Sequence, residues 1–184
     1  MKLVKFGLLV ILVSVGRHHV SAQNINPIPI SVNVSATPLE VIPGDVELDD
    51  LQAGTIYSVV PDGNGGLVIT PNDGAATVSS ATETNIVGDM NAKVLVSFIL
   101  PTRLFPNSSG GTGVILANFS NTSAAWGPSG AENNYFDPRA SIIMQLDASG
   151  NIFFNLGGIF EVPPTTETDT FIGEALVTAQ YTGL

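Results

Sequence analysis

The chain has 184 residues, with sixteen acidic side chains against six basic ones, no cysteine and a formal charge of −10 at pH 7. This charge disfavours partners such as nucleic acid or an anionic membrane surface, which attract clustered Lys and Arg. The lack of cysteine excludes disulfides and thiol chemistry. A chain of this length can bury an adequate core without disulfides, so we expect one domain.

The first 22 residues have the pattern of a secretory signal peptide. Lys2 and Lys5 form a positive start, residues 6–15 form an apolar stretch too short to span a bilayer, and Ala22 ends a small-residue cleavage site. No later apolar run is long enough for a membrane helix. We therefore expect a secreted or cell-surface protein that does not insert into the membrane after cleavage.

Cleavage changes the chemistry that remains available to the protein. It removes three basic residues of six and both histidines, His18 and His19, so the formal charge changes from −10 to −13. Without His and Cys, a Ser-His-Asp triad, a Cys-His pair and a His-ligated zinc site are excluded. Glu132 and Asp137 could in principle act as paired carboxylates, but a solvated loop explains them better. We expect no enzymatic activity.

Residues 23–36 form an alternating segment at the start of the mature chain. Its apolar positions are Ile28, Ile30, Val32 and Val34, and polar residues or Pro lie between them. The pattern predicts an N-terminal strand with two interpretations of equal weight. The segment is either the first strand of its own sheet, or a donor strand that pairs with a neighbouring copy.

The middle of the chain predicts a series of short strands. Residues 55–60 and 67–70 flank Asp-Gly and Asn-Gly dipeptides and predict a hairpin. The other expected elements are an acidic loop at 43–50, one short strand and a loop at 75–91, a central strand at 92–100, a strand at 114–119 and three closing strands within 141–184. The spacing predicts an antiparallel β-sandwich of about eight to nine strands over residues 37–184.

One group of residues has the chemistry of a cation-binding site. Asp45, Asp49, Asp62 and Asn64 offer the oxygen ligands that calcium prefers, but without the spacing of an EF-hand loop, so turn formation explains them better. We expect no cofactor, with calcium as the one ion to consider.

Residues 120–139 lack periodicity and predict a long loop, a kind of segment that is often functional. This loop holds Trp126 and Tyr135, which could form an aromatic platform for a glycan. The competing interpretation places the single Trp in the core.

The closing third also resembles a known family. An uncharacterised family of secreted bacterial domains ends in Leu-Gly-Gly and Val-Thr-Val-x-Tyr motifs, and residues 147–162, Gly173 and residues 175–181 are similar to this ending. Residues 98–101 resemble the hydrophobic-x-Leu-Pro strand of the same family. The resemblance implies an immunoglobulin-like β-sandwich without assigned catalysis, in the general plan of pilin-like or spore-coat-like surface proteins.

Two functions follow as expectations. The first is a non-enzymatic extracellular structural protein, a surface or filament subunit that associates with itself or with other surface proteins by β-strand donation. The alternative is a monomeric carbohydrate-binding or adhesin module that uses Trp126 and Tyr135.

Overall fold

A computed structural model of the chain divides into two compact units, Met1–Ser35 and Ala36–Leu184. It describes residues 37–71 and 76–183, all of them in the second unit. The predicted signal peptide (1–22) and the alternating segment (23–36) with Ile28, Ile30, Val32 and Val34 lie outside the described residues. Within the described part, no helix is long and apolar enough to cross a membrane.

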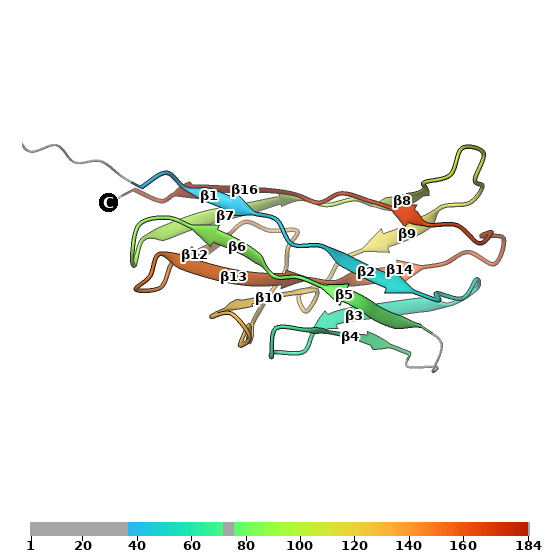
Figure 1. Cartoon of the computed structure of the whole chain (residues 1–184), viewed down its shortest axis with the longest axis horizontal. Helices are drawn as coiled ribbons and strands as arrows, with labels where there is room; N and C mark the ends of the chain where they lie inside the picture. Colours follow the sequence, from blue (N-terminus) through green and yellow to red (C-terminus); the bar gives the residue numbers. More distant parts are fainter. Residues whose placement is uncertain (1–36, 72–75, 184) are drawn as a thin grey trace, which may run out of the picture. The chain divides into compact units, whose positions relative to one another are not determined.

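The described residues form sixteen strands in four sheets (Figure 1). The strands are β1 (Glu40–Ile42), β2 (Val46–Asp49), β3 (Ile56–Pro61), β4 (Leu67–Thr70), β5 (Thr77–Ala81), β6 (Thr84–Val87), β7 (Lys93–Ile99), β8 (Arg103–Pro106), β9 (Ile115–Asn118), β10 (Ala124–Gly127), β11 (Asn134–Phe136), β12 (Ile142–Gln145), β13 (Asn151–Leu156), β14 (Gly158–Glu161), β15 (Phe171–Ile172) and β16 (Leu176–Tyr181). All described pairings are antiparallel.

The four sheets differ in size and order. The five-stranded sheet has the order β1-β6-β13-β10-β11, the three-stranded sheet β12-β7-β16, the six-stranded sheet β15-β8-β9-β14-β3-β4 and the two-stranded sheet β2-β5. The closing third contains five strands, β12 to β16, where the sequence predicted three. They do not pair with one another, because each joins strands from earlier in the chain. Long-range pairing therefore holds the closing third in place.

The first core cluster fills the space between the five-stranded and three-stranded sheets. Its buried members are Ile86, Val94, Val96, Ala124, Phe136, Met144, Leu146, Ile152 and Phe154. Phe98 packs against this cluster, with its ring edge-on to Phe154 at a centroid distance of 5.5 Å. The alternation of apolar and polar residues along β7 places Val94 and Val96 on this buried face.

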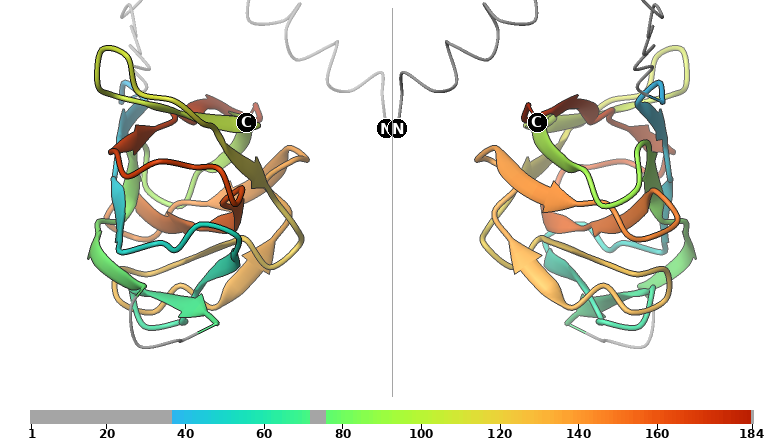
Figure 2. Two further views of the ribbon diagram at one scale, coloured as in Figure 1. Left: turned by 90° about the vertical axis from the view of Figure 1, so that its right-hand side faces the viewer. Right: turned by 90° about the vertical axis from the view of Figure 1, so that its left-hand side faces the viewer.

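The second core cluster lies between the six-stranded and two-stranded sheets. Its buried members are Tyr57, Val59, Ile69, Ala76, Ile115 and Val162, with Leu48 and Val78 of the two-stranded sheet packed against them. Seen end-on, the strands enclose the interior from opposite sides (Figure 2). The described unit therefore contains two hydrophobic core clusters, each between two of its sheets.

The hairpin predicted from its glycines is confirmed. The N–H of Asp62 donates to the carbonyl of Gly66 at 3.0 Å, and Gly63 and Gly65 have φ values of 80° and 84°. Such positive φ values favour glycine, which has no Cβ to collide with its own carbonyl group. The strands β3 and β4 pair across this turn.

The prediction of an all-β antiparallel fold is confirmed, but the expected count of eight to nine strands is too low. The predicted loop at 120–139 contains β10 and β11, and the acidic loop at 43–50 contains β2. These strands have only three or four residues, too few for a period of two to stand out in the sequence. β10 and β2 pair with strands distant in the chain, whereas β11 pairs with its neighbour β10.

Candidate functional site

Two carboxyl groups from distant parts of the chain meet beside the turn that joins β10 to β11. The N–H of Gly130 donates to Glu83 Oε1 at 2.7 Å and to Glu132 Oε1 at 3.0 Å. The hydroxyl of Ser129 donates to Glu83 Oε2 at 2.7 Å. We call these four residues, Glu83, Ser129, Gly130 and Glu132, the carboxyl cluster.

Local sequence explains how the turn presents its donors. The N–H of Ala131 donates to the carbonyl of Pro128 at 3.0 Å, and Gly130 has a φ of 72°, as the third residue of a type II turn requires. Glu83 reaches this turn from the two-residue connection between β5 and β6. The carboxyl cluster therefore joins two turns far apart in the sequence.

The two carboxyl groups have opposite electrostatic properties. Burial, followed by the hydrogen bond with Glu83, raises the pKa of Glu132 to about 7. Burial would also raise the pKa of Glu83, but hydrogen bonds from Glu132, Ser129 and Gly130 together lower it. Two adjacent carboxyl groups repel each other when both ionise, so Glu132 keeps its proton to a higher pH than Glu83 does.

Glu132 is sealed from solvent. Its side chain is fully buried, and its Oε2 atom receives no hydrogen bond within the described residues. A Cβ at Gly65, on the β3–β4 hairpin, would lie 2.9 Å from Gly130 Cα and 3.0 Å from Glu83 Oε1. The close approach of this hairpin covers the cluster, so the arrangement holds turns together and does not present Glu132 to a substrate.

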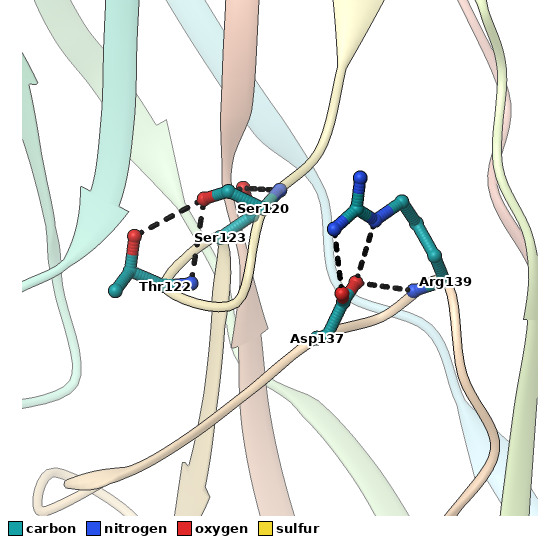
Figure 3. Close-up of polar contacts among 5 residues, drawn as sticks. All are labelled: Ser120, Thr122, Ser123, Asp137 and Arg139. Carbon is teal, nitrogen blue, oxygen red and sulfur yellow. Dashed lines mark hydrogen bonds and ion pairs between the residues drawn. The ribbon is translucent and has the colours of Figure 1, made fainter.

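The paired carboxylates considered from the sequence, Glu132 and Asp137, have different partners in the structure. Asp137 accepts hydrogen bonds from the backbone N–H, Nε and Nη2 of Arg139 at 3.0, 2.9 and 2.7 Å (Figure 3). This contact lowers the pKa of Asp137 to about 2. Glu132 instead faces Glu83, a partner that the sequence did not indicate.

Figure 3 also shows the turn that leads into β10. The N–H of Ser120 donates to the hydroxyl of Ser123 at 2.8 Å, and the N–H of Ser123 donates back to the carbonyl of Ser120 at 3.2 Å. Ser123 is fully buried, and its carbonyl accepts a hydrogen bond from the N–H of Gly157 at 2.7 Å. These contacts fix where β10 begins.

The calcium candidates form turns and strand ends. Asp62 Oδ1 accepts from the N–H groups of Asn64 and Gly66 at 2.7 and 3.0 Å, which brings Asp62 and Asn64 together in the β3–β4 turn. Asp45 precedes β2 and bonds to Thr82, whereas Asp49 ends β2. No group of three or more His, Cys, Asp or Glu residues suited to a metal occurs among the described residues.

The glycan candidates Trp126 and Tyr135 lie on neighbouring strands but on opposite faces. Trp126 pairs with Asn134 and packs against the first core cluster, whereas Tyr135 pairs with Ala125, one position along. Tyr135 is 48% exposed, and its hydroxyl donates to the carbonyl of Pro61 at 3.0 Å. The two rings do not share a platform.

An exposed apolar region, which sequence reasoning missed, lies where β7 gives way to β8 and β15 to β16. Two cross-strand pairs, Ile99 with Leu176 and Phe105 with Ile172, have exposed fractions between 48% and 66%. Phe105 and Ile172 line an open depression of about 540 Å³, together with Leu100, Pro101, Thr102, Arg103, Gly173 and Glu174. Ile99 and Leu176 are close to this lining in the sequence but are not part of it. We call the lining residues, with Ile99 and Leu176, the apolar depression.

The strand β16 is an edge strand that continues from the apolar depression. All six of its residues pair with β7, and it ends the order of its sheet. The first described residue, Thr37, is fixed beside the far end of β16, because its carbonyl accepts from the Tyr181 hydroxyl at 2.9 Å and its N–H donates to Asp89 at 2.8 Å. The chain therefore enters the described unit where β16 finishes.

Comparison of the chain with family models, with curated proteins and with solved structures finds no match.

Proposed function

We propose that this chain is a non-enzymatic extracellular structural protein, a surface or filament subunit on an immunoglobulin-like β-sandwich, that assembles by adding a strand to an exposed sheet edge. The observation that carries the proposal is the edge of β16. This strand has six residues, whereas the other strands that end a sheet have two to five. An open edge presents unpaired N–H and C=O groups to another chain.

The sequence of β16 lacks the features that normally prevent such pairing, although β1 of the five-stranded sheet lies close to part of this strand. Its sequence from Leu176 to Tyr181 contains no charged residue and no proline, and its register with β7 has no bulge. Natural sheets usually protect long edges with Lys, Pro or a bulge. An unprotected edge in a chain with strong net negative charge favours controlled pairing over general aggregation.

The sequence of the chain supplies a matching strand. Residues 24–36 contain no charged side chain and alternate apolar and polar positions. Ile28, Ile30, Val32 and Val34 share one parity, as a strand that inserts one apolar face requires. Donation from copy to copy does not close on itself, so it builds filaments.

The test compares residues 23–184 with two single variants of the alternating segment. Ile30→Asp places a charge on the apolar parity, and Asn33→Asp places the same charge on the polar parity. We expect wild type and Asn33→Asp to sediment as oligomers and to form filaments in negative stain, with assembly at least tenfold weaker in Ile30→Asp. A wild-type chain that stays monomeric at about 100 µM, far above most specific affinities, would contradict the proposal.

A further inference from the structure

The apolar depression exposes residues that a monomer normally buries. Ile99 is 66% exposed, Phe105 and Leu176 are each 56% exposed, and Ile172 is 48% exposed. Each belongs to a cross-strand pair with another member of the group. A gathered set of exposed large apolar side chains marks an interaction surface more often than scattered ones do.

One residue that lines the depression, Gly173, packs closely against a neighbouring side chain. A Cβ at Gly173 would lie 2.3 Å from Leu104 Cδ2, so only glycine fits here without displacing that side chain. Gly173 lies in the connection between β15 and β16, and Pro101 follows the end of β7. Both residues line the depression.

From these contacts we propose that the apolar depression, together with the first half of the β16 edge, is the docking site for residues 28–34 of a second copy of this chain. The inference rests on the proposed function and deepens it by naming the acceptor. A strand of seven residues spans about 23 Å, enough to pair with the start of β16 and continue over the depression.

The charges of the two surfaces agree with this occupant. The depression carries one basic and one acidic residue, Arg103 and Glu174, within an apolar lining. Residues 28–34 carry no charge in a chain whose formal charge is −10. Contact through an uncharged segment brings the fewest like charges together when two copies meet.

Strand direction favours a second copy over the same chain. Thr37 is fixed at the Tyr181 end of β16, so a segment that ran back along this edge from Thr37 would lie parallel to β16. Every described pairing is antiparallel. β8, which carries lining residues of the depression, lies away from the end at which β1 begins and β16 finishes (Figure 1). Such an arrangement suits head-to-tail contact.

The test uses a fluorescent synthetic peptide of residues 24–36 and the Ile30→Asp variant of residues 23–184 as acceptor, since its own segment competes weakly. Fluorescence anisotropy reports the dissociation constant. Adding Phe105→Ser and Ile172→Ser to the acceptor is expected to weaken peptide binding at least tenfold. The matched control adds Val68→Ser and Ile143→Ser, which are 49% and 56% exposed elsewhere, and is expected to bind as the parent does.

The outcomes separate the inference from the proposed function. If both double variants lose the same amount of peptide affinity, or neither loses any, the docking site is wrong. Peptide binding to the parent acceptor would then still support strand addition. A peptide that fails to bind, with a monomeric wild type, overturns both. Circular dichroism melting checks that each acceptor is folded, and Ile172→Thr alone replaces the double variant if that one unfolds. Anisotropy that is insensitive to Ile30→Asp in the peptide itself also contradicts the inference.

Discussion

At the carboxyl cluster a carboxyl group, Glu132, is fully buried, whereas at the apolar depression large apolar side chains such as Ile99 and Phe105 are more than half exposed. Both depart from the usual distribution, in which buried polar groups and exposed apolar patches are the informative exceptions. The cluster has its partners within the chain, since Glu83 and Gly130 both contact Glu132. At the depression, the large apolar side chains stay exposed within residues 37–71 and 76–183. The difference separates a contact that stabilises the unit from a surface that is available to a second molecule.

Position in the fold explains the difference. The carboxyl cluster lies where the β5–β6 and β10–β11 turns and the β3–β4 hairpin converge, so neighbouring backbone covers it. The apolar depression lies between strands of two different sheets, at the ends of β7 and β15. Among the described strands, no third element covers the place where one sheet ends and the other begins.

The largest expected effect is a pH dependence of stability that arises from Glu132. Its pKa is raised from 4.5 to about 7, so the folded state binds the proton more tightly than the unfolded state does. This stabilisation is complete below pH 4.5 and is lost as the pH rises through 7. We expect the free energy of unfolding to fall by about 2 kcal/mol between pH 5 and pH 8, given 1.36 kcal/mol per pKa unit and a discount for coupling.

Urea unfolding followed by Trp126 fluorescence measures this slope. Glu132→Gln keeps a donor toward Glu83 but cannot ionise, so its stability should be level across pH 5 to 8. Asp137→Asn is the control, because Asp137 has a pKa of about 2 and stays charged throughout this range. Because the pKa of Glu83 is lowered, its contribution to stability is lost as the pH falls below the usual range of a Glu carboxyl, and not between pH 5 and pH 8. A wild type with equal stability at both pH values would refute this role.

The next effect comes from the close approach of the β3–β4 hairpin. Gly65→Ala adds a Cβ 2.9 Å from Gly130 Cα at a φ of 84°, and it should destabilise the unit by about 2 kcal/mol. Gly110→Ala is the matched control, because Gly110 has a φ of 100° but no atom within 4 Å of the added Cβ. The difference between the two isolates the packing against the cluster. Equal losses in urea unfolding would show that this contact contributes nothing.

The sequence predicted what is local and missed what is long-range. The β3–β4 hairpin was found because Gly63 and Gly65 mark a turn within six residues, and β7 because seven residues alternate. Glu83 and Glu132 meet only because β5–β6 and β10–β11 turns converge in space. The one local signal was the turn sequence Pro128-Ser129-Gly130 close to Glu132. This pattern does not identify Glu83 as the partner of Glu132.

The apolar depression could not be predicted for a related reason. Ile99 and Leu176 end or begin runs of strand alternation, and such a run does not say which parity is buried. The structure shows that the Val94 and Val96 parity of β7 faces the first core cluster. The strands themselves were predictable from the sequence. Ile99 is exposed because of how these strands pair in sheets of different size, which the sequence did not show.

The smallest expected effect concerns the stability of the apolar depression itself. In the Ile30→Asp background, Ile99→Thr with Leu176→Thr should change the free energy of unfolding by no more than about 0.5 kcal/mol, because exposed side chains outside special contacts contribute little. Ile115→Thr, at a residue only 4% exposed in the second core cluster, should instead cost about 2 kcal/mol or more. Urea unfolding measures both. A large loss at Ile99 and Leu176 would mean that these side chains stabilise the unit, so they would no longer contrast with the buried carboxyl of Glu132.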